Sequence, residues 1–186
     1  MKLIYLGCQR TALHSLGQLG FTLLETTIVM IMLAILMSTA LPGFMGLWQL
    51  RCLTVAQDEM YQGMRLAQSN AMQNKVSWQF SLRDQGDYLE WAVHAQGIDP
   101  TQVPVWHPLR QSLVLDESDT TLRKQGNVYY VRFDLMGNIN GQLGRVTLAS
   151  EHGGRARRCV VASTLIGALR KGKEQPVADS NGRYCY

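Results

Sequence analysis

Glu25 is a lone carboxylate at the edge of a long apolar stretch, and the chemistry open to it is an ion pair with an amine. Residues 26–50, which follow it directly, contain no charged side chain. A charge beside such a stretch is costly unless it finds a partner of opposite sign. We therefore expect a functional partner for Glu25. The simpler alternative is an ordinary signal anchor with an irregular first turn.

Residue patterns typical of enzymes are missing from the sequence. It has no Gly-x-Ser-x-Gly, no His-Glu-x-x-His and no phosphate-binding glycine loop. Besides His14 near the N-terminus, the histidines are His94, His107 and His152, which are scattered at no ligand-like spacing, and there is no Cys-x-x-Cys pair. We predict no enzymatic activity, no metal, no cofactor and no small-molecule substrate.

The apolar stretch itself predicts a membrane-spanning helix. Residues 21–41 supply the roughly 20 apolar residues that such a helix needs. Lys2 and Arg10 precede it without an acidic residue, as in a segment that stays in the cytoplasm. Pro42 and Gly43 interrupt the stretch, where we expect a bend. Cleavage after Ser38-Thr39-Ala40, giving a secreted product, is the alternative interpretation.

The residues that open this stretch carry a family resemblance. Gly20-Phe21-Thr22-Leu23-Leu24-Glu25 resembles the class III leader site of type IV prepilins and pseudopilins. The resemblance implies that a prepilin peptidase cuts after Gly20 and that Phe21 becomes the N-methylated terminus. It also implies that Glu25 pairs with the terminal amine of a neighbouring subunit, and that Pro42 marks a kink or a melted turn.

Beyond Arg51 the pattern changes to that of an amphipathic helix reaching about residue 74. One face carries apolar side chains at steps of three or four residues, and the opposite face is expected to meet water. The apolar set is Leu53, Ala56, Met60, Met64, Ala67 and Ala71, and the water-facing set is Gln57, Asp58, Gln62, Arg65 and Ser69.

From residue 75 apolar residues alternate, which is typical of strands. We predict strands within 76–82, 88–93, 112–115, 128–133, 145–148 and 158–162, and an irregular loop at 95–112. The predicted fold class is α+β, a long N-terminal helix packed on a mostly antiparallel sheet, which the resemblance makes type IV pilin-like. The predicted parts are a leader at 1–20, transmembrane and amphipathic helix halves at 21–44 and 45–74, and a head at 75–186.

Cysteines indicate one disulfide. Loss of the leader removes Cys8 and leaves Cys52, Cys159 and Cys185 in an extracytoplasmic product, where disulfides form. We predict a Cys159–Cys185 pair, because it would tie the polar tail 171–186 to a core strand and contribute ~3 kcal/mol. The alternative is that all three are reduced.

The order of several segments resembles one branch of the pilins, the GspH/FimT family of minor pilins and pseudopilins. These segments are 53–57, 65–71, 131–134 with Gly137, 158–161 and 167–170. The resemblance implies an inner-membrane subunit with a periplasmic head, which joins other pilin subunits at the tip or initiation complex of a type IV pilus. A minor pseudopilin of a type II secretion system is the alternative.

Basic residues gather late in the chain, where residues 144–173 contain a single acid, Glu151. The candidate phosphate-binding residues are Arg155, Arg157, Arg158, Arg170, Lys171 and Lys173. Some FimT-like pilins bind DNA through a Gly-Arg-x-Arg motif, and the corresponding stretch here, Gly167-Ala168-Leu169-Arg170, has alanine in place of the first arginine. DNA binding for natural transformation is a second alternative, and a solvated basic face is the simplest interpretation.

Overall fold

The structure is a computed structural model that describes residues 22–109, 112–151, 153–163 and 166–186. The predicted cleavage site at Gly20 and Phe21 lies outside these residues. One long helix and two antiparallel sheets are described, so the fold class is α+β, as predicted. The chain divides into two compact units, one ending at Gly43 and the other spanning Phe44–Tyr186.

Helix α1 spans Leu23–Asn74. Up to Gly43 its surface is apolar apart from Glu25, and the few hydroxyl groups are satisfied within the helix. They donate to carbonyl oxygens three residues earlier, at 2.8 Å from Thr26, Thr27 and Ser38 and at 3.0 Å from Thr39. Hydroxyls paired in this way leave no unsatisfied polar group on the apolar surface of the helix.

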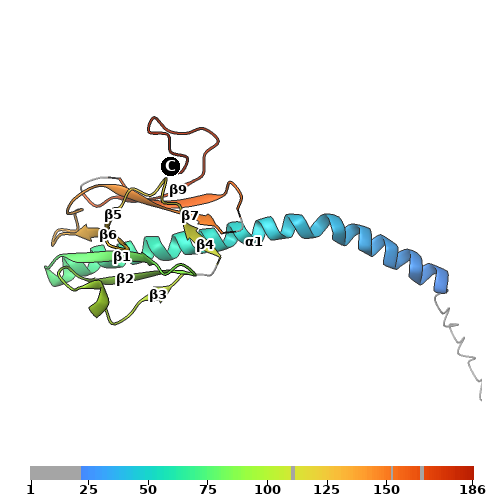
Figure 1. Ribbon diagram of the computed structural model, residues 1–186, viewed down its shortest axis with the longest axis horizontal. Coiled ribbons are helices and arrows are strands. Elements are labelled where there is room, and N and C mark those ends of the chain that lie inside the picture. Colours follow the sequence, from blue (N-terminus) through green and yellow to red (C-terminus); the bar gives the residue numbers. More distant parts are fainter. Residues whose placement is uncertain (1–21, 110–111, 152, 164–165) are drawn as a thin grey trace, which may run out of the picture. The chain divides into compact units, whose positions relative to one another are not determined.

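In the second unit, α1 lies between two sheets (Figure 1). The predicted apolar stripe is confirmed, because all six of its side chains have no exposed surface. Gly63 allows the close approach of the helix to one sheet. A Cβ atom at this position would lie 2.8 Å from ring carbons of Phe80 and Trp91.

The strands form two separate sheets, where the sequence predicted one. The first has the order β3-β2-β1-β6-β5 and the second the order β4-β7-β8-β9, with every named pairing antiparallel. The first consists of β1 (Trp78–Asp84), β2 (Leu89–Ala95), β3 (His107–Pro108), β5 (Arg123–Gln125) and β6 (Val128–Phe133). The second consists of β4 (Leu113–Leu115), β7 (Gly144–Ser150), β8 (Arg157–Ala162) and β9 (Leu169–Lys173), and a short 3₁₀ helix, η1, spans Pro100–Gln102.

Alternation along a strand indicates which face is buried but not which strand is its neighbour. The division into two sheets therefore could not be predicted from the sequence. Strands β3, β5 and β9 were not predicted at all. All three residues of β5 are exposed, and β9 buries only Leu169 and Gly172. Main-chain pairing rather than apolar burial defines these strands.

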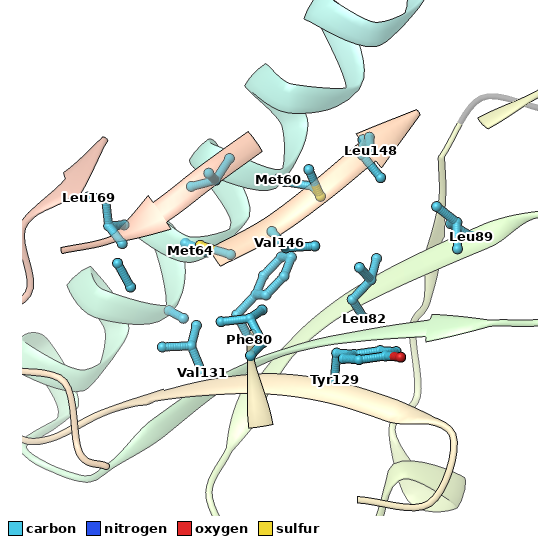
Figure 2. Packing of buried hydrophobic residues seen from close by; sticks show 14 of the residues in the cluster. Met60, Met64, Phe80, Leu82, Leu89, Tyr129, Val131, Val146, Leu148 and Leu169 are labelled. Carbon is cyan, nitrogen blue, oxygen red and sulfur yellow. The ribbon is translucent and has the colours of Figure 1, made fainter. Parts of the chain in front are cut away.

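The core is one cluster shared by α1 and both sheets. Figure 2 shows the helix side chains meeting strand side chains from the two sheets. The labelled residues are Met60 and Met64 of α1, Phe80 and Leu82 of β1, Leu89 of β2, Tyr129 and Val131 of β6, Val146 and Leu148 of β7, and Leu169 of β9. Helix and sheets therefore bury their apolar faces together.

One prediction about α1 was wrong. Gln57 was expected to face water, but it is only 4% exposed. Its amide nitrogen donates to the main-chain oxygens of Cys159 on β8 and Gly172 on β9, each at 2.6 Å. The helical pattern placed Gln57 beside the apolar stripe, and the second sheet extends far enough around the helix to cover it.

The predicted disulfide between Cys159 and Cys185 is present, with Cα atoms 6.1 Å apart, and Cys52 is a free thiol. The tail is also held through Arg145 of β7, which is 8% exposed. Its guanidinium donates to the main-chain oxygen of Cys185 and lies 3.2 Å from a carboxylate oxygen of Asp179. Both contacts fix the end of the chain against the second sheet.

Candidate functional site

Glu25 lies in the first turn of α1, where local hydrogen bonding fixes the start of the helix. Its main-chain N–H donates to Oγ1 of Thr22 at 3.2 Å, and an acid three residues after a threonine is the pattern of a capping box. A carboxylate at this end is also favoured by the helix dipole. The Thr-x-x-Glu spacing is the sequence signal of this helix start.

The carboxylate of Glu25 is exposed and makes no ion pair with any described residue. Its surroundings are apolar and equally uncovered. Leu23 is 82% exposed and Met30 69%, and a shallow hollow on this part of α1 is lined by Thr26, Val29, Met30 and Leu33. This part of α1 therefore presents one carboxylate on an exposed apolar surface, and such surfaces typically contact a membrane or another protein.

The first part of α1 is long and apolar enough to cross a membrane. Its mean hydropathy is 2.2, and none of that segment is buried within the structure. Pro42 and Gly43 both fall within the bounds of α1, and the bend at these residues stays a prediction. No atom lies within 4 Å of where a Cβ at Gly43 would be, so no described contact requires glycine there.

The predicted phosphate-binding residues do not form a single patch. Arg157 is held by Asp116 at 2.5 Å, and Lys171 by Asp58 of α1 at 2.8 Å. Arg158 and Lys173 are opposite each other in the β8–β9 ladder. The other two, Arg155 and Arg170, are exposed.

The ion pair of Asp116 has an electrostatic consequence. Burial raises the pKa of this carboxyl, but hydrogen bonding by the Ser118 hydroxyl and the charge of Arg157 together bring the pKa below its ordinary value of 3.8. Asp116 is therefore ionised at neutral pH and neutralises Arg157. This arginine is accordingly less available to a phosphate than the sequence indicated.

A buried polar chain crosses the face of the first sheet that points away from α1. Arg132 donates to Gln79 at 2.7 Å, and Gln79 donates to Ser81 at 2.8 Å. The Ser81 hydroxyl lies 2.9 Å from Nε2 of His94, whose Nδ1 lies 3.0 Å from the oxygen of Ala95. A carbonyl only accepts, so Nδ1 of neutral His94 carries the hydrogen and Nε2 accepts from Ser81.

A serine beside a histidine is the basis of many nucleophiles, but this serine has no exposed surface, so no substrate reaches it. The guanidinium of Arg83 stacks on Trp106 at 3.9 Å, and Val103 is 7% exposed, so the loop after β2 packs over this face. The network is thus structural. Within the described residues, no His, Cys, Asp or Glu side chains are grouped to hold a metal ion.

A family model described as type II transport protein GspH matches residues 56–165. The chain belongs to the GspH family. It is a minor pilin or pseudopilin of the GspH/FimT type, a family of structural subunits. The family match begins in the buried stripe of α1 and ends before β9. Glu25 and the tail that contains Cys185 therefore both lie outside the matched region.

Solved structures with similarity to this GspH-family chain include two bacterial proteins. The type IV minor pilin FimU of Pseudomonas aeruginosa is 16% identical, with 63% of this chain and 86% of that chain covered and a TM-score of 0.44. The minor pseudopilin EpsH from the type 2 secretion system of Vibrio cholerae is 13% identical, with 64% and 94% covered and a TM-score of 0.46. A sequence comparison with curated proteins gives no match.

Proposed function

We propose that this GspH-family chain is a minor type IV pilin-like subunit that packs α1 into the tip or initiation complex of a pilus and so assists pilus assembly. The observation that carries the proposal is the exposed carboxylate of Glu25 on an otherwise apolar helix surface. Membership of a family of pilin and pseudopilin subunits supports the same role.

The proposed sequence of events begins in the inner membrane, with a single pass of α1 and the head in the periplasm. Prepilin peptidase cuts after Gly20, and Phe21 becomes the N-methylated terminus. Subunits then associate through α1. Glu25 pairs with the terminal amine of a neighbour, and in a medium of low dielectric constant this attraction is much stronger than in water. The head caps the assembly or recruits partners and performs no chemistry.

Glu25 would favour one axial alignment of neighbouring α1 helices over the others. Apolar helices in lipid gain little from the hydrophobic effect, so a single charged pair contributes a large part of the preference for one axial register. The amine–carboxylate distance depends on that register. An unpaired Glu25 in a misaligned neighbour would remain a charge in an apolar environment.

The alternative is a minor pseudopilin of a type II secretion system, which the description of the matching family favours. The two roles differ in what fails when the gene is deleted. Loss of surface pili with normal protein export supports the pilus role. Loss of export of secreted enzymes with normal pili supports the secretion role, and restoration by the plasmid-borne gene is the control.

DNA binding for natural transformation remains a second alternative prediction. Two of its candidate residues, Arg157 and Lys171, are held in ion pairs. Duplex DNA titrated into the detergent-solubilised full chain at several salt concentrations tests it. Affinity that falls steeply with salt supports this role, and no binding at low salt excludes it.

The first experiment is the intact mass and N-terminal sequence of the protein isolated from membranes. The proposal expects a chain that begins at N-methyl-Phe21. A chain that begins at Met1, or after Ala40, contradicts the proposal, because neither product carries a free amine four residues before Glu25.

A further inference from the structure

Basic residues from separate elements come together at the end of the head where α1 enters it. Arg51 is on α1, and Arg158 and Lys173 are partners across the β8–β9 ladder. Arg155 belongs to the connection between β7 and β8.

Arg158 and Lys173 lie on the face of the second sheet that contacts α1. Side chains two residues apart on a strand share a face. Val160, two residues after Arg158, is fully buried in the core. Lys171, two residues before Lys173, reaches Asp58 of α1 at 2.8 Å.

Hydrogen bonds from α1 then fix the end of the sheet at which they lie. Gln68 donates to the oxygen of Gly167, just before β9, and Gln57 donates to the oxygen of Gly172, near its end. β9 therefore runs back along α1, and Lys173 lies towards Arg51. Six residues of helix, about 9 Å, separate Gln57 from Arg51.

The β7–β8 connection lies at the same end. The last pair of the β7–β8 ladder before this connection is Ala149 with Arg157, and Arg157 is next to Arg158. Figure 1 shows this connection beside α1 where the helix leaves the sheets. Arg155 within it is exposed.

These cations have no anionic partner among the described residues, unlike Arg157 and Lys171. Arg51, Arg155 and Lys173 are exposed, and half-buried Arg158 donates to the main-chain oxygen of Arg157 at 2.9 Å. Like charges directly opposite in a ladder are destabilising. A bound anion would remove that cost.

The residues of α1 that precede Arg51 indicate which anion is near. Phe44, Met45, Leu47 and Trp48 are all more than half exposed. Tryptophan is enriched at both membrane–water interfaces, and long basic side chains near the end of a membrane helix extend to the interface. The charge-free stretch 26–50 ends at Arg51, so the chain has the order of residues expected across a membrane surface.

We propose that Arg51, Arg155, Arg158 and Lys173 form a cationic collar that binds anionic phospholipid head groups. The proposal rests on the proposed function in placing α1 in a membrane, and it adds a lipid ligand for the folded head. Phosphate oxygens of the lipid neutralise the Arg158–Lys173 pair. The collar holds the head at the membrane surface until the subunit is withdrawn into a fibre.

The test uses the full chain in micelles of a non-ionic detergent, titrated with dioctanoyl phosphatidylglycerol and, separately, with dioctanoyl phosphatidylcholine. Isothermal titration calorimetry gives both affinities. We expect phosphatidylglycerol to bind more tightly, with an affinity that falls as salt is added. The double variant Arg158→Gln/Lys173→Gln should lose about fivefold in affinity for each cation removed.

The matched control is Arg170→Gln/Lys75→Gln, which removes the same charge at the other end of β9 and of α1, and it should bind like the unmodified chain. The variant Arg158→Lys keeps the charge and should retain binding. The unfolding temperature of each variant shows that it is folded, and if the double variant does not fold, Arg51→Gln provides the same comparison.

Equal affinity for the two lipids would overturn the proposal, as would an equal loss in the control variant. Tighter binding of a DNA duplex that depends on Arg158 and Lys173 would also overturn it and assign these residues to nucleic acid. Failure of the proposed function has a different signature. A chain that stays soluble without detergent would contradict the membrane placement of α1 on which the proposed function and the collar both rest, whereas an inserted chain with no anionic preference contradicts only the collar.

Discussion

The side-chain amide of Gln57 in α1 lies 2.6 Å from the main-chain oxygen of Gly172 in β9, and it donates a second bond of the same length to Cys159. One buried side chain thus fixes both β8 and β9 against the helix.

Replacing Gln57 by leucine should lower the free energy of unfolding by about 1–3 kcal/mol, since two buried carbonyl oxygens lose a donor. Denaturant unfolding of the full chain in detergent measures this. Gln62→Leu, at an exposed position on the same helix, is the control and should change stability by less than about 0.5 kcal/mol. Equal effects from the two variants would show that Gln57 does not hold the strands.

Removing the disulfide by Cys185→Ser should destabilise the protein by about 2–4 kcal/mol and release the tail after β9 to proteases, because the 26-residue separation is no longer closed. Limited proteolysis with mass spectrometry maps the cleavage sites. Cys52→Ser serves as the control, since Cys52 is a free thiol. A tail that stays protected in Cys185→Ser would mean that Arg145 and Asp179 suffice to hold it.

Gly63→Ala should destabilise the protein by about 1–3 kcal/mol, because the new methyl group meets the rings of Phe80 and Trp91 at 2.8 Å. Gly46→Ala on the same helix meets nothing within 4 Å and should be neutral or stabilising. The thermal unfolding midpoints of the two variants make the comparison. A neutral Gly63→Ala would show that the helix and first sheet separate easily.

Acid should destabilise the head partly through Asp116, whose pKa is lowered by Ser118 and Arg157 despite its burial. A lowered folded-state pKa gives stability that is present above the unfolded value, about 4, and is lost as pH falls through the folded value. Asp116→Asn should therefore lose stability at pH 7 and show a smaller further loss on acidification to pH 3. Asp87→Asn, at an exposed carboxylate that makes no ion pair with any described residue, is the comparison. An unchanged pH dependence in Asp116→Asn would exclude this contribution.

Glu25→Ala should leave the head folded but strongly reduce incorporation into the fibre, because the terminal amine of the neighbour loses its carboxylate partner. The amount of subunit in sheared fibres, relative to that in membranes, measures incorporation. Glu25→Asp keeps the charge, so this variant should still be incorporated into the fibre in part. Normal incorporation of Glu25→Ala would refute the proposed pairing.

Local patterns in the sequence determined several features by themselves. The charge-free stretch is recognised from its composition, and the six-residue apolar stripe of α1 from its helical period. Both could therefore be predicted without knowledge of the tertiary contacts. β1 alternates between apolar and polar residues, and β6 and β8 contain short apolar runs. The strands β1, β2, β6, β7 and β8 were all predicted to within a few residues. Counting the thiols that remain after leader removal allowed one disulfide, and Cys159–Cys185 was chosen because it ties the polar tail to a core strand.

Only the tertiary structure decided which residues far apart in sequence meet. Gln57 was predicted to face water because helical periodicity says nothing of how far a sheet extends around the helix. The late basic residues looked alike in sequence, but strand alternation and the carboxylates of Asp116 and Asp58 separate them into paired and unpaired cations. Ser81 and His94 join a buried network because a loop covers their side of the sheet. Contacts of this kind depend on register and packing between distant segments, which a one-dimensional pattern does not contain.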